Sequence, residues 1–125
     1  MAMAYHEPTE ELSAEARNVH RALSSLCEEL EAVNWYNQRA DVLEDPQLKA
    51  LIEHNRDEEI EHAAMLLEWL RRLLPKFDEE LRTYLFSSGD ITLLEEAGGE
   101  DGGEAQGSAS SRASGSGSLG IGSLR

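Results

Sequence analysis

Two long segments of this chain contain no glycine, and proline occurs only at the ends of the second. These two segments limit the folds that the chain can adopt. In the first, residues 10–39, apolar side chains recur at alternating intervals of four and three residues. They are Leu12, Ala16, Val19, Leu23, Leu26, Leu30 and Val33. This spacing places them on one side of an α-helix. We therefore predict a long first helix, capped at its start by Thr9 or Ser13.

The stretch "VLEDPQ" interrupts this pattern and predicts the start of a second helix. Asp45 has the side chain of an N-cap, and Pro46 suits the first helical turn because its missing N–H would be unpaired there. The second helix is predicted to run to about Leu74. Residues 76–86 predict a short third helix that stops at Ser87–Gly89.

These elements predict an all-α fold: an antiparallel two-helix hairpin plus a short C-terminal helix. The apolar faces are wider than one partner helix can cover. The additional positions are Ala22 and Tyr36 on the first helix and Leu51, Met65, Leu67, Leu70 and Leu74 on the second. Either two chains dimerise into a four-helix bundle, which we favour, or the third helix and the N-terminal segment cover the surplus.

The second helix carries polar residues in its apolar row. That row reads Leu48, Ile52, Asn55, Glu59, His62, Leu66, Trp69 and Leu73. A carboxylate buried without a partner costs several kcal/mol, and lysine and arginine are scarce on the inner rows. The first helix adds another acid, Glu29, to its own flanking row. A bound dication would best relieve the repulsion among these carboxylates.

Glu59 and His62 form a Glu-x-x-His motif, which ferritin-like di-iron bundles use twice, together with one glutamate from each of two further helices. This chain has one such motif and one such glutamate, Glu29. A two-fold dimer would supply both missing halves. The alternative is that Glu59 and His62 only bond each other across an interface.

A second cluster, Glu28, Glu31 and Trp35, shares a side of the first helix that points away from the apolar rows. These acids could be ordinary solvated surface. Together with the exposed tryptophan, they could instead contact another subunit and attract cations toward the centre.

Charge and cysteine content narrow the class of protein. The formal net charge is −14, which argues against nucleic acid and membranes as partners and favours cations. Cys27 is the one cysteine, so no intramolecular disulfide is possible, and a reducing cytoplasm fits. No apolar run reaches membrane-spanning length.

The chain divides into four predicted parts: an N-terminal extension (1–11), a helical domain (12–94), a flexible Gly/Ser-rich linker (95–117) and a terminal peptide (118–125). The linker has too few large apolar residues to form a core. The peptide "GSLGIGSLR" spaces three apolar anchors by glycine, a pattern typical of segments that bind extended in grooves of a partner. The anchors are Leu119, Ile121 and Leu124.

The motifs "EELEAVNWYNQR" (28–39), "HNRDEEIEHAAMLLEWLRR" (54–72) and "LRTYLF" (81–86) resemble the encapsulated ferritins. The resemblance implies dimers that complete a di-iron ferroxidase centre and close into a ring, a decamer of five dimers. It implies Glu29, Glu59 and His62 as catalytic iron ligands and Tyr36 beside them. It also implies Glu28, Glu31 and Trp35 as a secondary site, for which calcium or zinc are candidates.

The terminal peptide resembles the targeting peptide of encapsulin cargo, which implies that the encapsulin shell protein is a partner and that the chain lies within a cytoplasmic nanocompartment. The leading hypothesis is therefore a ferroxidase that oxidises iron(II) with dioxygen and supplies iron for storage inside the shell. The alternatives are a di-iron peroxidase of the ferritin-like type and a metal-free helical cargo adaptor.

Overall fold

The computed structural model describes residues 3–100, and every regular element among them is helical. The elements are a 3₁₀ turn, η1 (Thr9–Glu11), and the helices α1 (Ala14–Val42), α2 (Pro46–Leu73), α3 (Pro75–Tyr84) and α4 (Ile91–Glu100). The all-α prediction is confirmed. The chain divides after Leu73 into two units, one with η1, α1 and α2 and the other with α3 and α4. None of the helices in the described range is both long and apolar enough to cross a membrane.

Helix α1 starts at a side-chain cap. The Ser13 hydroxyl oxygen accepts a hydrogen bond from the Ala16 N–H at 3.0 Å, so Ser13 is the cap of the two candidates. Residues 9–11 form the separate turn η1, so α1 begins at Ala14, later than residue 10. It ends at Val42, where the Leu43 N–H donates to the Arg39 carbonyl.

Helix α2 begins as the sequence predicts. The Asp45 carboxylate accepts a hydrogen bond from the Leu48 N–H at 2.7 Å, and Pro46 is the first helical residue. The helix ends at Leu73, two residues before Pro75 opens α3. Helix α2 thus ends one residue before Leu74, the predicted end, and the proline that follows begins a separate helix.

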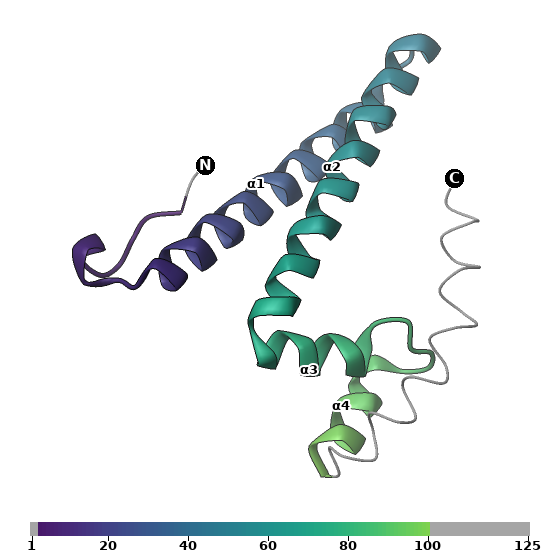
Figure 1. Ribbon diagram of the computed structural model, residues 1–125. Helices are drawn as coiled ribbons and strands as arrows, with labels where there is room; N and C mark the ends of the chain where they lie inside the picture. Colours follow the sequence, from purple (N-terminus) through teal and green to yellow (C-terminus); the bar gives the residue numbers. More distant parts are fainter. Residues whose placement is uncertain (1–2, 101–125) are drawn as a thin grey trace. The chain divides into compact units, whose positions relative to one another are not determined.

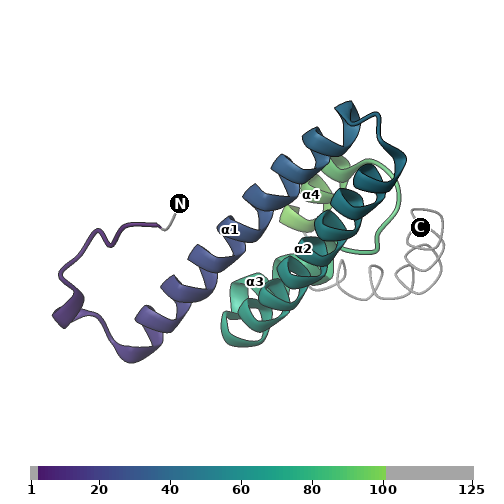
Figure 2. The same cartoon turned by 90° about the horizontal axis from the view of Figure 1, so that it is seen from above.

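Helices α1 and α2 pack as an antiparallel hairpin (Figures 1 and 2). Small side chains line much of their contact: Ala22, Ala40 and Ala63 are buried, and Leu70 is fully buried at 0 % exposure. Alanine allows two helix backbones to approach closely, because its side chain ends at Cβ. The larger apolar residues of the predicted rows are only partly used. Those that remain exposed in the single chain include Leu30, Leu48, Leu51, Met65 and Trp69.

The N-terminal segment lies against α1; the sequence offered this segment as partial cover for the apolar faces but predicted none of its individual contacts. The Met3 N–H donates to the hydroxyl oxygen of the buried Ser24 at 3.2 Å. The rings of Tyr5 and His20 stack with centroids 3.9 Å apart. These contacts have no periodic signal, because an irregular segment repeats at no fixed interval. The segment covers part of α1 on the side where His20 and Ser24 lie.

The second unit contains a helix where the sequence predicted a linker. The predicted linker begins at residue 95, but α4 continues to Glu100, so this boundary is wrong for residues 95–100. The Asp90 carboxylate accepts a hydrogen bond from the Thr92 N–H at 3.0 Å and starts the helix. Near its end, a Cβ added at Gly98 would lie 4.0 Å from Thr83 Cγ2, so α4 packs on α3 through a glycine. Packing against α3 therefore outweighs the low helix propensity of glycine.

The third predicted helix is present but shorter than expected. Helix α3 ends at Tyr84, and the backbone then turns through positive φ angles of 60° at Phe86 and 89° at Gly89. A left-handed conformation at a bulky residue such as Phe86 is uncommon and ends the regular helix. The predicted linker beyond Glu100 and the terminal peptide with Leu119, Ile121 and Leu124 lie outside the described residues.

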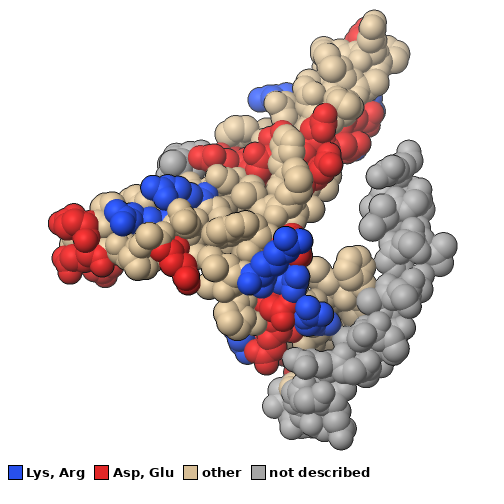
Figure 3. Space-filling view, viewed as in Figure 1, with Lys and Arg blue, Asp and Glu red and all other residues tan. Residues whose placement is uncertain are grey.

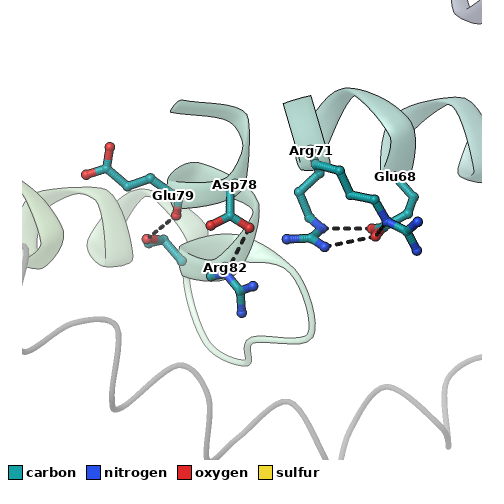
Figure 4. A network of polar contacts seen from close by, with 7 residues as sticks. Glu68, Arg71, Asp78, Glu79 and Arg82 are labelled. Carbon is teal, nitrogen blue, oxygen red and sulfur yellow. Dashed lines mark hydrogen bonds and ion pairs between the residues drawn. The ribbon is translucent and has the colours of Figure 1, made fainter. Parts of the chain in front are cut away.

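Ion pairs stabilise the ends of the helices in each unit (Figure 4). In the first unit, the Glu68 carboxylate accepts hydrogen bonds from Arg71 at 2.8 Å and from Arg72 at 2.7 Å, which lower the pKa of Glu68 to about 2. In the second unit, Arg82 donates to Asp78 at 2.9 Å. The two arginines near the end of α2 also complement the negative end of its helix dipole.

Replacement of Leu70 by alanine tests whether the hairpin depends on this buried position. We expect Leu70→Ala to lower the free energy of unfolding by about 2–5 kcal/mol, because it leaves a cavity at a fully buried site. The measurement is chemical denaturation followed by circular dichroism. Val42→Ala, at a side chain that is 76 % exposed, is the control and should change stability by less than about 0.5 kcal/mol. Equal effects of the two substitutions would contradict this account of the core.

Candidate metal centre

Three side chains from two helices converge on the hairpin. His62 Nδ1 lies 3.2 Å from Glu29 Oε2, across the α1–α2 contact, and 3.3 Å from Glu59 Oε1, one turn earlier on α2. One potential ligand atom from each residue lies within 4.8 Å of the other two. In the described part of the chain, this is the only group of three or more histidine, cysteine or acidic residues close enough to hold one metal ion.

The local sequence explains why these side chains meet. Glu29 lies seven residues after Ala22 and eleven before Ala40, so all three share one side of α1, since seven and eleven residues are close to whole numbers of turns. On α2, the buried Ala63 directly follows His62 and lies four residues after Glu59. The alanine contacts hold the two backbones near enough for a glutamate on α1 to reach an imidazole on α2.

The group lies at the surface of the single chain. The side chains of Glu29 and Glu59 are 23 % and 24 % exposed, and that of His62 is 46 % exposed. His62 also belongs to a row of exposed residues along α2, which we call the α2 stripe: Leu51, His62, Met65 and Trp69. Its members share one side of the helix, at intervals of three, four and eleven residues. In Figure 3, red carboxylates lie along the hairpin beside tan surface.

The donor set fits a borderline or hard divalent metal. Two carboxylates and one imidazole offer oxygen and nitrogen ligands, which suit iron, zinc and manganese, and no thiolate is among them. One chain supplies three ligand residues, so with one donor atom from each, a single copy leaves three positions of a six-coordinate ion to water or to another subunit. Pairing the carboxylates with His62, as the alternative interpretation expects, and binding a cation are both compatible with these distances.

The second predicted cluster lies on another side of α1. Glu28, Glu31 and Trp35 are roughly 100–160° around the helix from Glu29. Trp35 is half exposed, Glu28 is exposed, and Glu31 is partly exposed. Within residues 3–100, Glu28 and Glu31 do not come together with a third acidic, histidine or cysteine side chain closely enough to hold one metal ion. Their role as a secondary site stays a prediction.

Tyr36 lies on the same side of α1 as Glu29, two turns further along, and is partly buried. The Arg39 guanidinium lies 5.6 Å from the centre of its ring, within the range of a cation–π contact. This contact holds the ring in place from within α1. The position of Tyr36 relative to a metal ion stays a prediction.

One residue that supports the site was missed. Arg56 on α2 donates to the Asn37 side-chain oxygen on α1 at 3.0 Å and to the neighbouring Asp57 at 3.1 Å. It therefore links the two helices between the metal-ligand group and the loop that connects α1 to α2. If Glu29 faces His62 in an antiparallel hairpin, residues 37 and 56 lie opposite each other as well. The contact of Arg56 with Asn37 could therefore have been predicted from the pairing of the two helices.

An all-helical hairpin with a Glu-x-x-His motif on one helix and a facing glutamate on the other is a ferritin-like arrangement. The chain belongs to the EncFtn-like family, which its sequence matches over residues 4–88. This match covers both long helices and α3, and it agrees with the family resemblance noted from the sequence motifs.

Individual relatives support the same assignment. The chain is 58 % identical over 123 residues to an "encapsulated ferritin-like protein" of Rhodospirillum rubrum, which covers 96 % of this chain and 86 % of that protein. It is 37 % identical over 79 residues to the "encapsulin nanocompartment cargo protein EncC" of Myxococcus xanthus, covering 59 % of this chain and 61 % of that one. A crystal structure of a Nitrosomonas europaea protein is 61 % identical, with a TM-score of 0.69, and covers 71 % of this chain and 98 % of that one.

The three residues should act together in metal binding. We expect Glu59→Gln to weaken binding of iron(II) by at least about tenfold, because the neutral amide removes a charged ligand and keeps nearly the same shape. Anaerobic isothermal titration calorimetry measures this affinity. Glu61→Gln is the matched control, since it removes the same charge from an exposed position on the same helix. If both variants bound iron(II) equally well, general acidity of the surface would explain the affinity, and the site would be rejected.

Proposed function

We propose that the protein is a ferroxidase, which oxidises iron(II) to iron(III) with dioxygen at a site shared between two copies of the chain. The observation that carries this proposal is the convergence of Glu29, Glu59 and His62 at the surface of a ferritin-like hairpin, with donor atoms within 4.8 Å of one another. Iron is the substrate. In the overall reaction, two iron(II) ions give one electron each to dioxygen, which takes up two protons and leaves as hydrogen peroxide.

The need for two copies follows from the ligands and from the apolar surface. One chain offers two carboxylates and one imidazole, and two metal ions need about twice that number. The exposed Leu30 directly follows Glu29 on α1, and the exposed Met65 follows His62 by about one turn on α2, so exposed apolar side chains lie beside the group. A second hairpin packed on this side, related by a two-fold axis, would cover the apolar residues and double the ligand set at once. We propose this antiparallel pair as the four-helix bundle.

The ligand types suit oxidation of iron. Anionic carboxylates stabilise iron(III) more than iron(II), since the harder and more highly charged ion gains more from them. This preference lowers the reduction potential of the metal and makes electron transfer to dioxygen favourable. The two glutamates of each chain together bring as much negative charge as two dications bring positive charge, so the two ions can be held close together.

The surface charge would supply the substrate. The net charge of −14 attracts cations, and Glu28 and Glu31 add negative charge on the side of α1 away from the centre. We propose that this outer cluster, with Trp35, forms a secondary cation site on the route to the centre, with calcium or zinc as alternative occupants. Tyr36 would lie beside the centre.

The names of the relatives suggest where the product goes. The Rhodospirillum rubrum protein is described as encapsulated and the Myxococcus xanthus protein as encapsulin cargo. We propose that this chain likewise binds an encapsulin shell, through Leu119, Ile121 and Leu124 of its terminal peptide, and delivers iron(III) inside that compartment. A ring of five dimers, as the family resemblance implies, would present ten such peptides and gain avidity without new contacts.

Iron oxidation can be measured directly. We expect Glu59→Ala and His62→Ala to reduce the rate at which iron(III) absorbance grows, by at least about tenfold, when air is admitted to anaerobic protein and iron(II). Glu61→Ala serves as the control. Equal rates for the native protein and the two site variants would refute the ferroxidase. Absence of bound iron by elemental analysis would favour a metal-free adaptor, and faster oxidation with peroxide than with dioxygen would favour a peroxidase.

Metal should also drive assembly. Ligands from two chains share each ion, so metal binding contributes free energy to their association. We expect sedimentation velocity to show larger species when iron(II) or zinc is added, and this shift should be lost in His62→Ala. A native protein that remains a monomer with and without metal would contradict a site shared between chains.

A further inference from the structure

The α2 stripe contains an oxidisable side chain next to the site. Met65 follows His62 by three residues, so its Cβ lies about 5–6 Å from that of His62 on the same helix. Met65 is 58 % exposed, and the His62 side chain is 46 % exposed on the same side of α2. The flexible thioether can therefore reach the space in front of the imidazole.

We propose that Met65 is an oxidation site, at which the chain itself consumes hydrogen peroxide formed at the Glu29–Glu59–His62 group. This inference rests on the proposed ferroxidase, because that reaction supplies the peroxide. The sulfur lone pair of Met65 takes one oxygen atom of the peroxide, the O–O bond breaks, and the second oxygen leaves as water with both protons. Sulfur loses two electrons, and the peroxide is reduced by two.

The position of Met65 gives it an advantage over the other sulfur atoms of the described residues. Met3 is 41 % exposed, but its N–H is bonded to Ser24, which lies about 140° around α1 from Glu29. Cys27 is exposed as well, about 160° around α1 from Glu29. In the single chain, peroxide from bulk solvent can reach all three side chains, whereas peroxide leaving the site meets Met65 first.

A second copy on the α2 stripe would strengthen this selectivity. It would cover Met65 from bulk solvent while leaving it beside the group that produces the oxidant. Met65 and Trp69 would then share the enclosed surface with His62. Of these neighbours, a thioether reacts with peroxide by direct oxygen transfer, so Met65 would protect the imidazole ligand from oxidation.

The test compares Met65 with Met3 under two sources of peroxide. Native protein is turned over with iron(II) and air in the presence of catalase, which destroys peroxide that reaches bulk solvent. A second sample, without iron or catalase, receives hydrogen peroxide directly. Peptide mass spectrometry measures the sulfoxide at each methionine, and iron(III) absorbance measures turnover in the first sample. The mixture with iron is also run with His62→Ala.

We expect the ratio of Met65 to Met3 sulfoxide to be at least about threefold higher under iron turnover with catalase than under added peroxide. The excess should disappear in His62→Ala. In addition, Met65→Leu without catalase should release more peroxide into solution than Met3→Leu, by up to one equivalent per chain, because each chain has one such thioether.

Three outcomes overturn the inference, and they differ in what they imply. Equal ratios in the two samples, with normal growth of iron(III) absorbance, reject Met65 as the sink and leave the ferroxidase intact. Oxidation of Trp69 in place of Met65 does the same. No iron(III) absorbance above that of a protein-free control rejects the ferroxidase and the peroxide source with it.

Discussion

The contact of one imidazole with two carboxylates on different helices is the interaction on which the functional argument depends. His62 lies within hydrogen-bonding distance of Glu29 and Glu59, so three side chains that could each be solvated separately are instead held together. Their spacing depends on the alanine contact between α1 and α2, since a larger residue at Ala22 or Ala63 would separate the backbones. The positions of the three candidate ligands therefore depend on how closely α1 and α2 pack.

The single chain also leaves many of its large apolar side chains exposed. Among the described residues, the buried side chains are few and mostly small, and larger apolar residues beside the ligand group are exposed. A hairpin of this kind gains stability when another apolar surface covers it. Because the exposed Leu30 and Met65 lie beside the ligands, association and metal binding would use the same surface. This coincidence distinguishes the site from an acidic patch that happens to contain a histidine.

Much of the fold could be predicted from the sequence. Ser13, Asp45 and Pro46 mark helix ends through local hydrogen bonds and backbone geometry, which depend on few residues and are readable from them. The facing of Glu29 with Glu59 and His62 could be predicted too, because helix periodicity and an antiparallel connection fix which residues meet. Helix α4 could not, since its glycines have low helix propensity and only contact with α3 compensates for them. The contacts of Met3 and Tyr5 were missed because irregular segments leave no repeating pattern. Helix periodicity places Glu28, Glu29, Glu31, Glu59 and His62 on their faces, but it does not determine whether they bind a metal ion. Their roles as ligands stay predictions.

The placement of the N-terminal segment has a consequence for how hairpins could be arranged in a larger particle. Met3 and Tyr5 contact Ser24 and His20 on one side of α1, which we call its outer side. Further along the same side, Trp35 and Val42 are exposed. The outer side of α1 thus differs between its two halves. The N-terminal segment of the same chain contacts the first half, and exposed apolar side chains of α1 lie on the second. A lateral neighbour would meet the N-terminal segment in the first half and the side chains of α1 itself in the second, and this difference would give each hairpin a defined direction in an array of hairpins.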